Sequence, residues 1–309
     1  METRRLKLEG PSVRGRKVNG PLLREILALV IDGSQKALRL RTQGRSAARG
    51  TLPTWIAAAT EFMLQIEEGS TILEIELPTL FEAAPEDFRQ SQLFPEIDPG
   101  IPAVDYLISS IQAALRADTA APIYDVPFLK FLGRLDNIFH HGVTTIEFQG
   151  GDREPQPLLL IDQSSVAKFH QLESRIPRPQ HVNVAGNLDT IRYTDRTFVL
   201  ALSEDQRIRG IAEHCDNLQD YWGKEVLTSG TAHFTVNGLV QRIEADSIRL
   251  ASSRDLSLFS VTPEPLSRSI AGHELRRPQG LRSGLNAVFG KWPGEESDEE
   301  ITESLNSLS

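Results

Sequence analysis

The stretch EVLTSGTAHFT (225–235), VNG (236–238) and LVQRIEADSIRL (239–250) decides the predicted fold of the second half of the chain. Apolar and polar residues alternate in part of each long run, a pattern typical of strands with one buried face. Between them, Asn237-Gly238 is a strong signal for a hairpin turn. We therefore predict two antiparallel strands joined at this turn.

Three further strand-like runs stand ahead of the hairpin. They cover residues 181–193, 197–202 and 207–212, and a short helix is predicted at 217–222. Three strands, a helix and two strands follow one another in the order of a closed barrel that resembles the OB-fold. We predict an OB-like β-barrel domain over residues 176–251, opened by the linker-like segment Ile176-Pro-Arg-Pro179.

The first half of the chain predicts a mixed α+β domain over residues 1–175. Apolar residues recur at helical spacing in residues 21–31, 53–66, 104–115 and 126–139, so we predict helices there. Strands are predicted at 6–8, 71–78, 143–148 and 158–161, a short helix at 164–172 and a long surface connection at 81–102.

The rest of the chain differs in composition from both domains. Residues 252–284 are rich in Ser, Pro and Arg with little periodicity, and we predict a flexible linker there. Residues 285–309 form a predicted acidic C-terminal interaction peptide. The predicted fold class is therefore α+β, with a mixed α+β domain, a small five-stranded OB-like β-barrel and a flexible tail.

The apolar and charged fractions of the sequence are those of ordinary soluble proteins. It has 309 residues, one cysteine (Cys215) and no apolar run near the ~20 residues that cross a bilayer. Its first residues lack the apolar core of a signal peptide. A single cysteine excludes an internal disulfide and a cysteine-based zinc cluster, and fits a reducing compartment. We expect a cytoplasmic protein without a membrane partner.

The sequence lacks the motifs of common catalytic and nucleotide-binding sites. It has no P-loop, no Gly-x-Gly-x-x-Gly after a strand and no Gly-x-Ser-x-Gly elbow. His140-His141 and His214-Cys215-Asp216 contain possible ligands, but adjacent side chains on a helix point in different directions. We predict a non-enzymatic protein with no catalytic, cofactor-binding or metal-binding residues and no cofactor.

The net charge of -9 is spread unevenly, with a basic start and an acidic end. The basic N-terminal segment could contact nucleic acid, since each neutralised phosphate releases counterions. On a helix face the same residues would simply keep the surface solvated. Its members are Arg14, Arg16, Lys17, Arg39, Arg41, Arg45 and Arg49.

Aromatic and basic residues also gather in the predicted barrel, as they do where single-stranded nucleic acid is held by stacking. We favour the alternative that Phe198, Trp222 and Phe234 fill the barrel, because they occupy positions expected to point inward. A closed barrel can equally serve as a protein-interaction platform. The full set is Tyr193, Phe198, Tyr221, Trp222 and Phe234 with Arg192, Arg196, Arg207, Arg209 and Arg242.

The closing segment, residues 289–305, combines an aromatic anchor, a turn and an acidic helix. Phe289 and Trp292 carry apolar area that the segment itself cannot bury. A Pro-Gly turn follows, and Ser297 with Glu300 has the capping-box spacing of a helix start. The segment docks either into a groove on a partner or back onto its own domain, and the sequence leaves both open.

The same segment, FGKWPGEESDEEI (289–301), resembles the C-terminal end of antitoxins that accompany PIN-domain ribonuclease toxins of the VapBC type. In that family the antitoxin's end lies across the toxin, and charged residues interfere with a metal-dependent acidic active site. The resemblance implies a PIN-domain toxin as partner, with Phe289 and Trp292 as anchors and Ile301 and Leu305 as the apolar helix face. The carboxylates that would lie near the toxin's metal or its basic cleft rim are Glu295, Glu296, Asp298, Glu299 and Glu300.

The leading functional hypothesis is an antitoxin-like interaction protein of a toxin-antitoxin system, whose C-terminal peptide binds and inhibits a PIN-type ribonuclease toxin. The alternative is an OB-fold nucleic-acid-binding protein, in which the barrel and the basic N-terminal segment contact single strands and the acidic tail competes in an autoinhibitory way. A third hypothesis is an enzyme of unrecognised type. It would need a set of catalytic residues gathered in a cleft, and the sequence shows no such set.

Overall fold

The computed structural model describes residues 1–13, 17–48, 50–66, 71–88, 97–118, 122–151, 157–192, 196–203, 206–213, 215 and 218–266. Residues 1–268 form one compact unit, which holds all the described residues.

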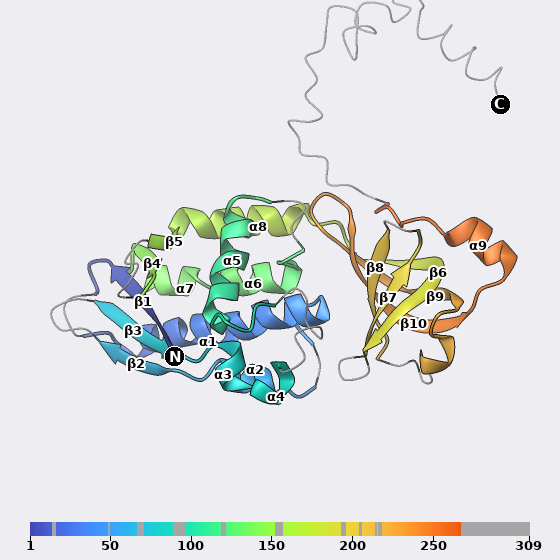
Figure 1. The fold of residues 1–309 in the computed structure, drawn as a ribbon. Coiled ribbons are helices and arrows are strands. Elements are labelled where there is room, and N and C mark those ends of the chain that lie inside the picture. Colours follow the sequence, from blue (N-terminus) through green and yellow to red (C-terminus); the bar gives the residue numbers. More distant parts are fainter. Residues whose placement is uncertain are drawn as a thin grey trace, which may run out of the picture. The chain divides into compact units, whose positions relative to one another are not determined.

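An antiparallel sheet organises the first part of this unit, with strand order β2-β3-β1-β4-β5 (Figure 1). Its strands are β1 (Glu2–Glu9), β2 (Met63–Ile66), β3 (Ile72–Leu77), β4 (Thr145–Gln149) and β5 (Pro157–Asp162). Leu6 and Phe148 are buried on one face, whereas Arg5 and Glu74 pair at 3.3 Å on the other. The period-two alternation thus gives the sheet one apolar and one charged face.

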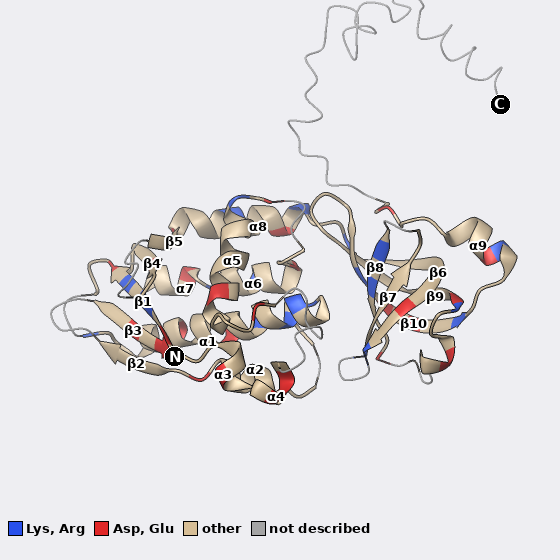
Figure 2. Ribbon diagram, in the orientation of Figure 1, with Lys and Arg blue, Asp and Glu red and all other residues tan. Residues whose placement is uncertain are grey.

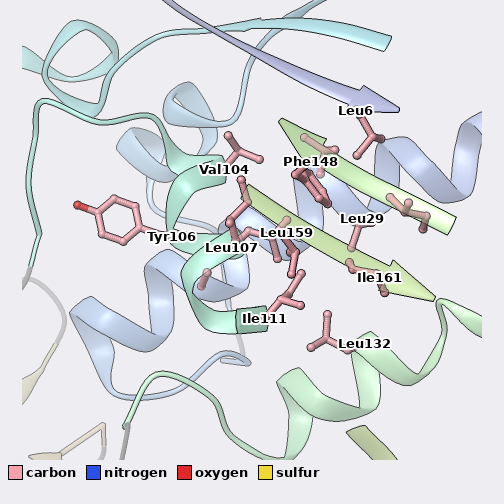
Figure 3. Packing of buried hydrophobic residues seen from close by; sticks show 14 of the residues in the cluster. Leu6, Leu29, Val104, Tyr106, Leu107, Ile111, Leu132, Phe148, Leu159 and Ile161 are labelled. Carbon is pink, nitrogen blue, oxygen red and sulfur yellow. The ribbon is translucent and has the colours of Figure 1, made fainter. Parts of the chain in front are cut away.

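Helices supply the rest of the first hydrophobic core. Leu29, Leu107 and Leu132 from the helices pack with Leu6 and Phe148 from the strands (Figure 3). The helices are α1 (Gly20–Gln43), α2 (Thr54–Ala59), α3 (Leu80–Ala83), α4 (Pro85–Phe88), α5 (Ala103–Leu115), α6 (Val126–Gly133), α7 (Asp136–His140) and α8 (Gln163–Arg175).

Both ends of helix α1 follow from local chemistry. The Asn19 side chain accepts a hydrogen bond of 2.8 Å from the Leu22 N–H, so it caps the start of the helix. At the other end Gly44 has a φ of 72° and donates its N–H to the Leu40 carbonyl at 2.9 Å. Glycine adopts this left-handed conformation most readily, so Gly44 ends the helix. The last backbone carbonyls of α1 then point away from the helix end.

The second part of the unit is a closed barrel with strand order β10-β8-β7-β6-β9. Strands β8 and β10 pair in parallel, and the other neighbours pair antiparallel. This pairing matches that of a five-stranded OB-like barrel. The elements are β6 (Gln180–Arg192), β7 (Thr197–Ala201), β8 (Arg207–Ile211), the 3-10 helix η1 (Leu218–Tyr221), β9 (Glu225–Phe234) and β10 (Val240–Leu250).

A second hydrophobic core fills this barrel, with Leu188, Phe198, Phe234 and Ile243 among its buried residues. Phe198 lies opposite Gly210 of the neighbouring strand. A Cβ at Gly210 would stand 2.1 Å from Cζ of Phe198, so glycine is required for this ring to fit. The predicted α+β fold class and the predicted barrel are therefore confirmed.

Two predicted helices differ from the structure. The helix predicted over 53–66 is wrong in its second half, because α2 ends at Ala59 and Met63–Ile66 pairs with β3 as strand β2. Pairing with the next strand along the chain outweighs local helical spacing there. The helix predicted over 126–139 is broken into α6 and α7 after Gly133, a poor helix former on which the His170 ring of α8 packs.

Two segments predicted without regular structure contain short helices. The predicted connection 81–102 includes most of α3 and all of α4, and α3 is fixed by a capping box between Thr79 and Glu82. Helix α9 (Ser253–Phe259) lies within the predicted linker 252–284, begins with a capping box between Ser252 and Asp255, and contacts β6 and β9. In both, local side-chain caps satisfy backbone groups that apolar periodicity does not reveal.

Candidate functional site

A cavity of about 570 Å³ opens on the face of the barrel formed by β6, β7 and β8. Its volume lies within the range of roughly 300–1,000 Å³ that is usual for ligand sites. The start of β10, the end of α1 and two loops of the first part complete its described walls. The residues that line this arginine cavity are Arg41, Thr42, Gly44, Ile97, Pro122, Ile123, Thr190, Arg192, Thr197, Phe198, Val199, Arg207, Arg209, Val240 and Gln241.

Three barrel arginines and Arg41 of α1 give the cavity its charge, and no carboxylate belongs to the described lining. Arg192 ends β6, while Arg207 and Arg209 are two residues apart on β8 and flank the buried Ile208. The strand alternation therefore turns Arg207 and Arg209 to the same outer face of the barrel. Figure 2 shows basic residues on β8 and in the last turns of α1.

The end of α1 holds the barrel arginines in place. Arg209 Nη1 donates to the Arg41 carbonyl at 3.1 Å, and Arg192 Nη1 donates to the Thr42 carbonyl at 3.4 Å. The last carbonyls of a helix lack helical partners and carry the negative end of its dipole, so they attract guanidinium groups. The guanidinium groups of Arg192 and Arg209 are thus held at the cavity before any ligand arrives.

A buried ion pair stands next to the cavity. Arg242 donates to the Gly44 carbonyl at 3.1 Å, and its Nη1 lies 3.7 Å from Oδ2 of Asp125, with side chains 5% and 4% exposed. Asp125 also caps α6 through the Phe128 N–H and accepts from the Ser46 N–H, each at 2.9 Å. One carboxylate therefore joins the Ser46 turn, α6 and the barrel.

Glu244 extends this network toward the barrel surface. Its Oε1 lies 3.3 Å from His233 Nε2 and 3.1 Å from Arg242 Nε. The His233 imidazole, followed by the Arg242 guanidinium, lowers the pKa of Glu244 to about 2, against the opposing effect of burial. The carboxylate is therefore ionised at neutral pH and helps to orient Arg242.

Among the described residues, the predicted aromatic side chains do not form a stacking platform at the cavity. Phe198 and Phe234 are each 2% exposed and fill the barrel, as favoured from the sequence. The expectation that Trp222 points inward is wrong, since it is 68% exposed and donates its indole N–H to the Asp189 carbonyl at 3.0 Å. Tyr221 packs against the barrel core at its edge, and Tyr193 lies outside the described residues.

Of the described members of the basic N-terminal segment, Arg41 belongs to the cavity lining. The Arg41 guanidinium donates to Ser109 Oγ at 2.7 Å and lies over the Tyr106 ring. Arg39 is buried and donates to two backbone carbonyls, and burial lowers its pKa. Arg45 pairs with Glu213. Lys17 is exposed, and Arg14, Arg16 and Arg49 lie outside the described residues.

The remaining barrel arginines have separate partners. Arg207 Nη1 is 3.7 Å from Asp189 Oδ2, and the two side chains are 63% and 41% exposed. Arg196 is exposed and donates to the Glu213 carbonyl. Alternation on β8 could have predicted that Arg207 and Arg209 share a face. Nothing in the sequence placed the end of α1 beside them.

Of the candidate metal ligands, the structure describes His140, His141 and Cys215. Among the described residues, no group of three or more His, Cys, Asp and Glu side chains could hold a metal ion. His140 closes α7, with Nδ1 2.7 Å from the Asp136 carbonyl, and His141 is the C-terminal cap. Cys215 is partly buried against the barrel core, whereas His214 and Asp216 lie outside the described residues.

A serine, a histidine and an aspartate lie in series on the barrel surface. Ser229 Oγ is 3.1 Å from His181 Nε2, and His181 Nδ1 is 3.6 Å from Asp246 Oδ2. The His181 and Asp246 side chains are 62% and 67% exposed. A hydrolytic triad works beside an oxyanion site from which water is excluded. This group is open to solvent, so we do not assign it a catalytic role.

The tail residues predicted to bind a partner all lie outside the described residues. They are Phe289, Trp292, Glu295, Glu296, Asp298, Glu299, Glu300, Ile301 and Leu305.

Comparison with protein-family models, with curated proteins and with solved structures finds no match for this chain. Of the helices in the described part of the chain, none is both long and apolar enough to cross a membrane.

Proposed function

We propose that the protein binds single-stranded nucleic acid at the arginine cavity, without catalysing a reaction on it. The observation that carries this proposal is the convergence of Arg192, Arg207 and Arg209 on one cavity whose described lining has no carboxylate. In OB-type barrels the face of the second and third strands holds oligonucleotides. Here those strands are β7 and β8, and both contribute to the cavity.

Local charge decides whether an anionic strand is attracted, although the whole chain has a net charge of -9. At about 0.1 M salt, exposed charges more than about 10 Å apart are largely screened. Asp189 is the carboxylate beside Arg207, and their separation of 3.7 Å between exposed side chains makes a weak pair. A phosphate can displace it, because arginine binds phosphate through two parallel N–H groups.

Fluorescence anisotropy with labelled oligo(dT) and oligo(U) at low salt tests the proposal. Arg207→Gln is the cleanest change, since its side chain is mostly exposed and lines the cavity. The lost phosphate contact should weaken binding by roughly 1 kcal/mol, or about 5-fold. Arg249→Gln is the matched control, because Arg249 is an exposed barrel arginine that pairs with Asp255 outside the cavity lining. The proposal would be contradicted if neither oligonucleotide binds at low salt, or if both variants lose the same amount of affinity.

A second candidate function rests on the sequence of residues 285–309. The anchors Phe289 and Trp292 and the acidic helix after them support an antitoxin-like role, in which this peptide binds and inhibits a PIN-domain ribonuclease toxin. The two functions use different parts of the chain. Each therefore has its own test.

Capture of a PIN-domain protein by the immobilised full chain tests this second candidate. Trp292→Ala should release the captured protein, because the anchor loses its apolar area. Trp222→Ala is the matched control, since Trp222 is an exposed tryptophan on the barrel and should leave capture unchanged. Capture that survives deletion of residues 285–309 would contradict the antitoxin-like role.

A further inference from the structure

The arginine cavity is poorly equipped to recognise bases by their edges. Side-chain amides and carboxylates are the usual readers of base edges besides arginine. Gln241 is the one such residue in the described lining, and its Nε2 donates to the carbonyls of Pro122 at 3.2 Å and Tyr124 at 3.1 Å. This amide therefore holds a wall of the cavity in place.

Stacking on bases is also unsupported by the described lining. Its aromatic member is Phe198, which is 2% exposed because its ring packs over Gly210 in the barrel core. A stacking residue needs a solvent-exposed ring face, and the Phe198 ring is buried. The apolar wall residues Ile123, Val199 and Val240 supply contact area without a preference among bases.

The lining arginines, in contrast, are suited to recognise phosphate. Arg192 and Arg209 are anchored by the last carbonyls of α1, and Arg207 is two residues from Arg209 on the same strand face. Guanidinium groups match the planar, bidentate geometry of phosphate oxygens. Because Arg192 and Arg209 are held before binding, their side chains lose little conformational freedom when a phosphate arrives.

We infer that the arginine cavity recognises the sugar-phosphate backbone of a single strand and not its bases. This inference rests on the proposed nucleic-acid-binding function and specifies its ligand class. Affinity depends on the number of phosphates and on salt. Base identity, and even the presence of a base, has little effect on it.

Competition against labelled oligo(dT) on the full-length protein tests this inference. The competitors are unlabelled oligo(dT), a thymine-guanine repeat and an abasic phosphodiester strand of the same length and charge. We expect all three to compete within about threefold of one another. Loss of a single stacked base would instead weaken the abasic competitor by about 5- to 150-fold. Tyr193→Ala, adjacent to Arg192, should leave the affinity for oligo(dT) unchanged.

The outcomes separate the inference from the function on which it rests. If oligo(dT) binds and the abasic strand competes more than about threefold worse, bases are recognised and the inference is wrong while the proposed function stands. A clear preference for the guanine-containing strand, or a loss on Tyr193→Ala, overturns it in the same way. If oligo(dT) itself does not bind, both fail. Arg207→Gln should weaken oligo(dT) and the abasic strand by the same factor, and a loss confined to oligo(dT) contradicts backbone recognition.

Discussion

Replacing Arg242 by methionine tests how firmly the barrel is joined to the end of α1. The Arg242 side chain is 5% exposed and lies 3.7 Å from Oδ2 of Asp125, which is 4% exposed. Breaking a buried ion pair usually costs about 3–5 kcal/mol. Asp125 keeps its hydrogen bonds from Ser46 and Phe128, so we expect the lower end, about 3 kcal/mol. Methionine retains most of the apolar stem, which separates lost charge from lost packing.

Urea unfolding at neutral pH, followed by tryptophan fluorescence, measures this cost. Trp55 packs against Phe88 in the first core and Trp222 lies on the barrel, so the two report on different parts. A Trp292→Phe background removes the signal of the third tryptophan. For a slope of about 2 to 3 kcal/mol/M, a loss of 3 kcal/mol lowers the midpoint by roughly 1 to 1.5 M.

The control is Arg249→Met on the same strand. Arg249 pairs with Asp255 at 2.9 Å, but its side chain is 57% exposed, so solvent screens the pair and we expect no resolvable shift of the midpoint. A midpoint for Arg242→Met within roughly 0.3 M of the parent would refute the assigned role of this ion pair. So would a shift of equal size in both variants.

Two further predictions concern the barrel. Gly210→Ala places a Cβ 2.1 Å from the Phe198 ring and should destabilise the barrel by about 1–3 kcal/mol, seen as a lower urea midpoint of the Trp222 signal. Glu244 has its pKa lowered from 4.5 to about 2, so it stabilises the fold above pH 4.5 and loses this effect as the pH falls toward 2. The urea midpoint of the parent protein should therefore fall between about pH 7 and pH 3, and Glu244→Gln should make this fall smaller. A fall of the same size in the variant and the parent would contradict the role of Glu244.

The barrel could be predicted from the sequence because its signals are local. Alternation over 225–235 and 239–250, with an Asn-Gly turn between them, is confirmed by β9 and β10. Strand β2 was missed because helical spacing continued past Ala59. The alternating Phe62, Leu64 and Ile66 become a strand only through pairing with β3.

The cavity depends on contacts that local patterns do not encode. The sequence singled out Arg41, Arg192 and Arg209 in two separate basic groups, and it gave no sign that they meet. Their meeting requires α1 to end at Gly44 and its carbonyls to accept from the barrel arginines. The aromatic prediction failed in part for a related reason: Trp222 follows η1 on the barrel surface and does not belong to an alternating strand.

The salt dependence of oligo(dT) affinity is the most direct test of phosphate binding at the arginine cavity. For single strands, the slope of log K against log salt is about -0.7 per neutralised phosphate. Three barrel arginines therefore give a slope of about -2, or roughly a 20-fold loss of affinity between 50 and 200 mM salt. We expect Arg207→Gln to make the slope shallower by about 0.7. A slope near zero, or one that is unchanged by Arg207→Gln, would contradict binding at this site.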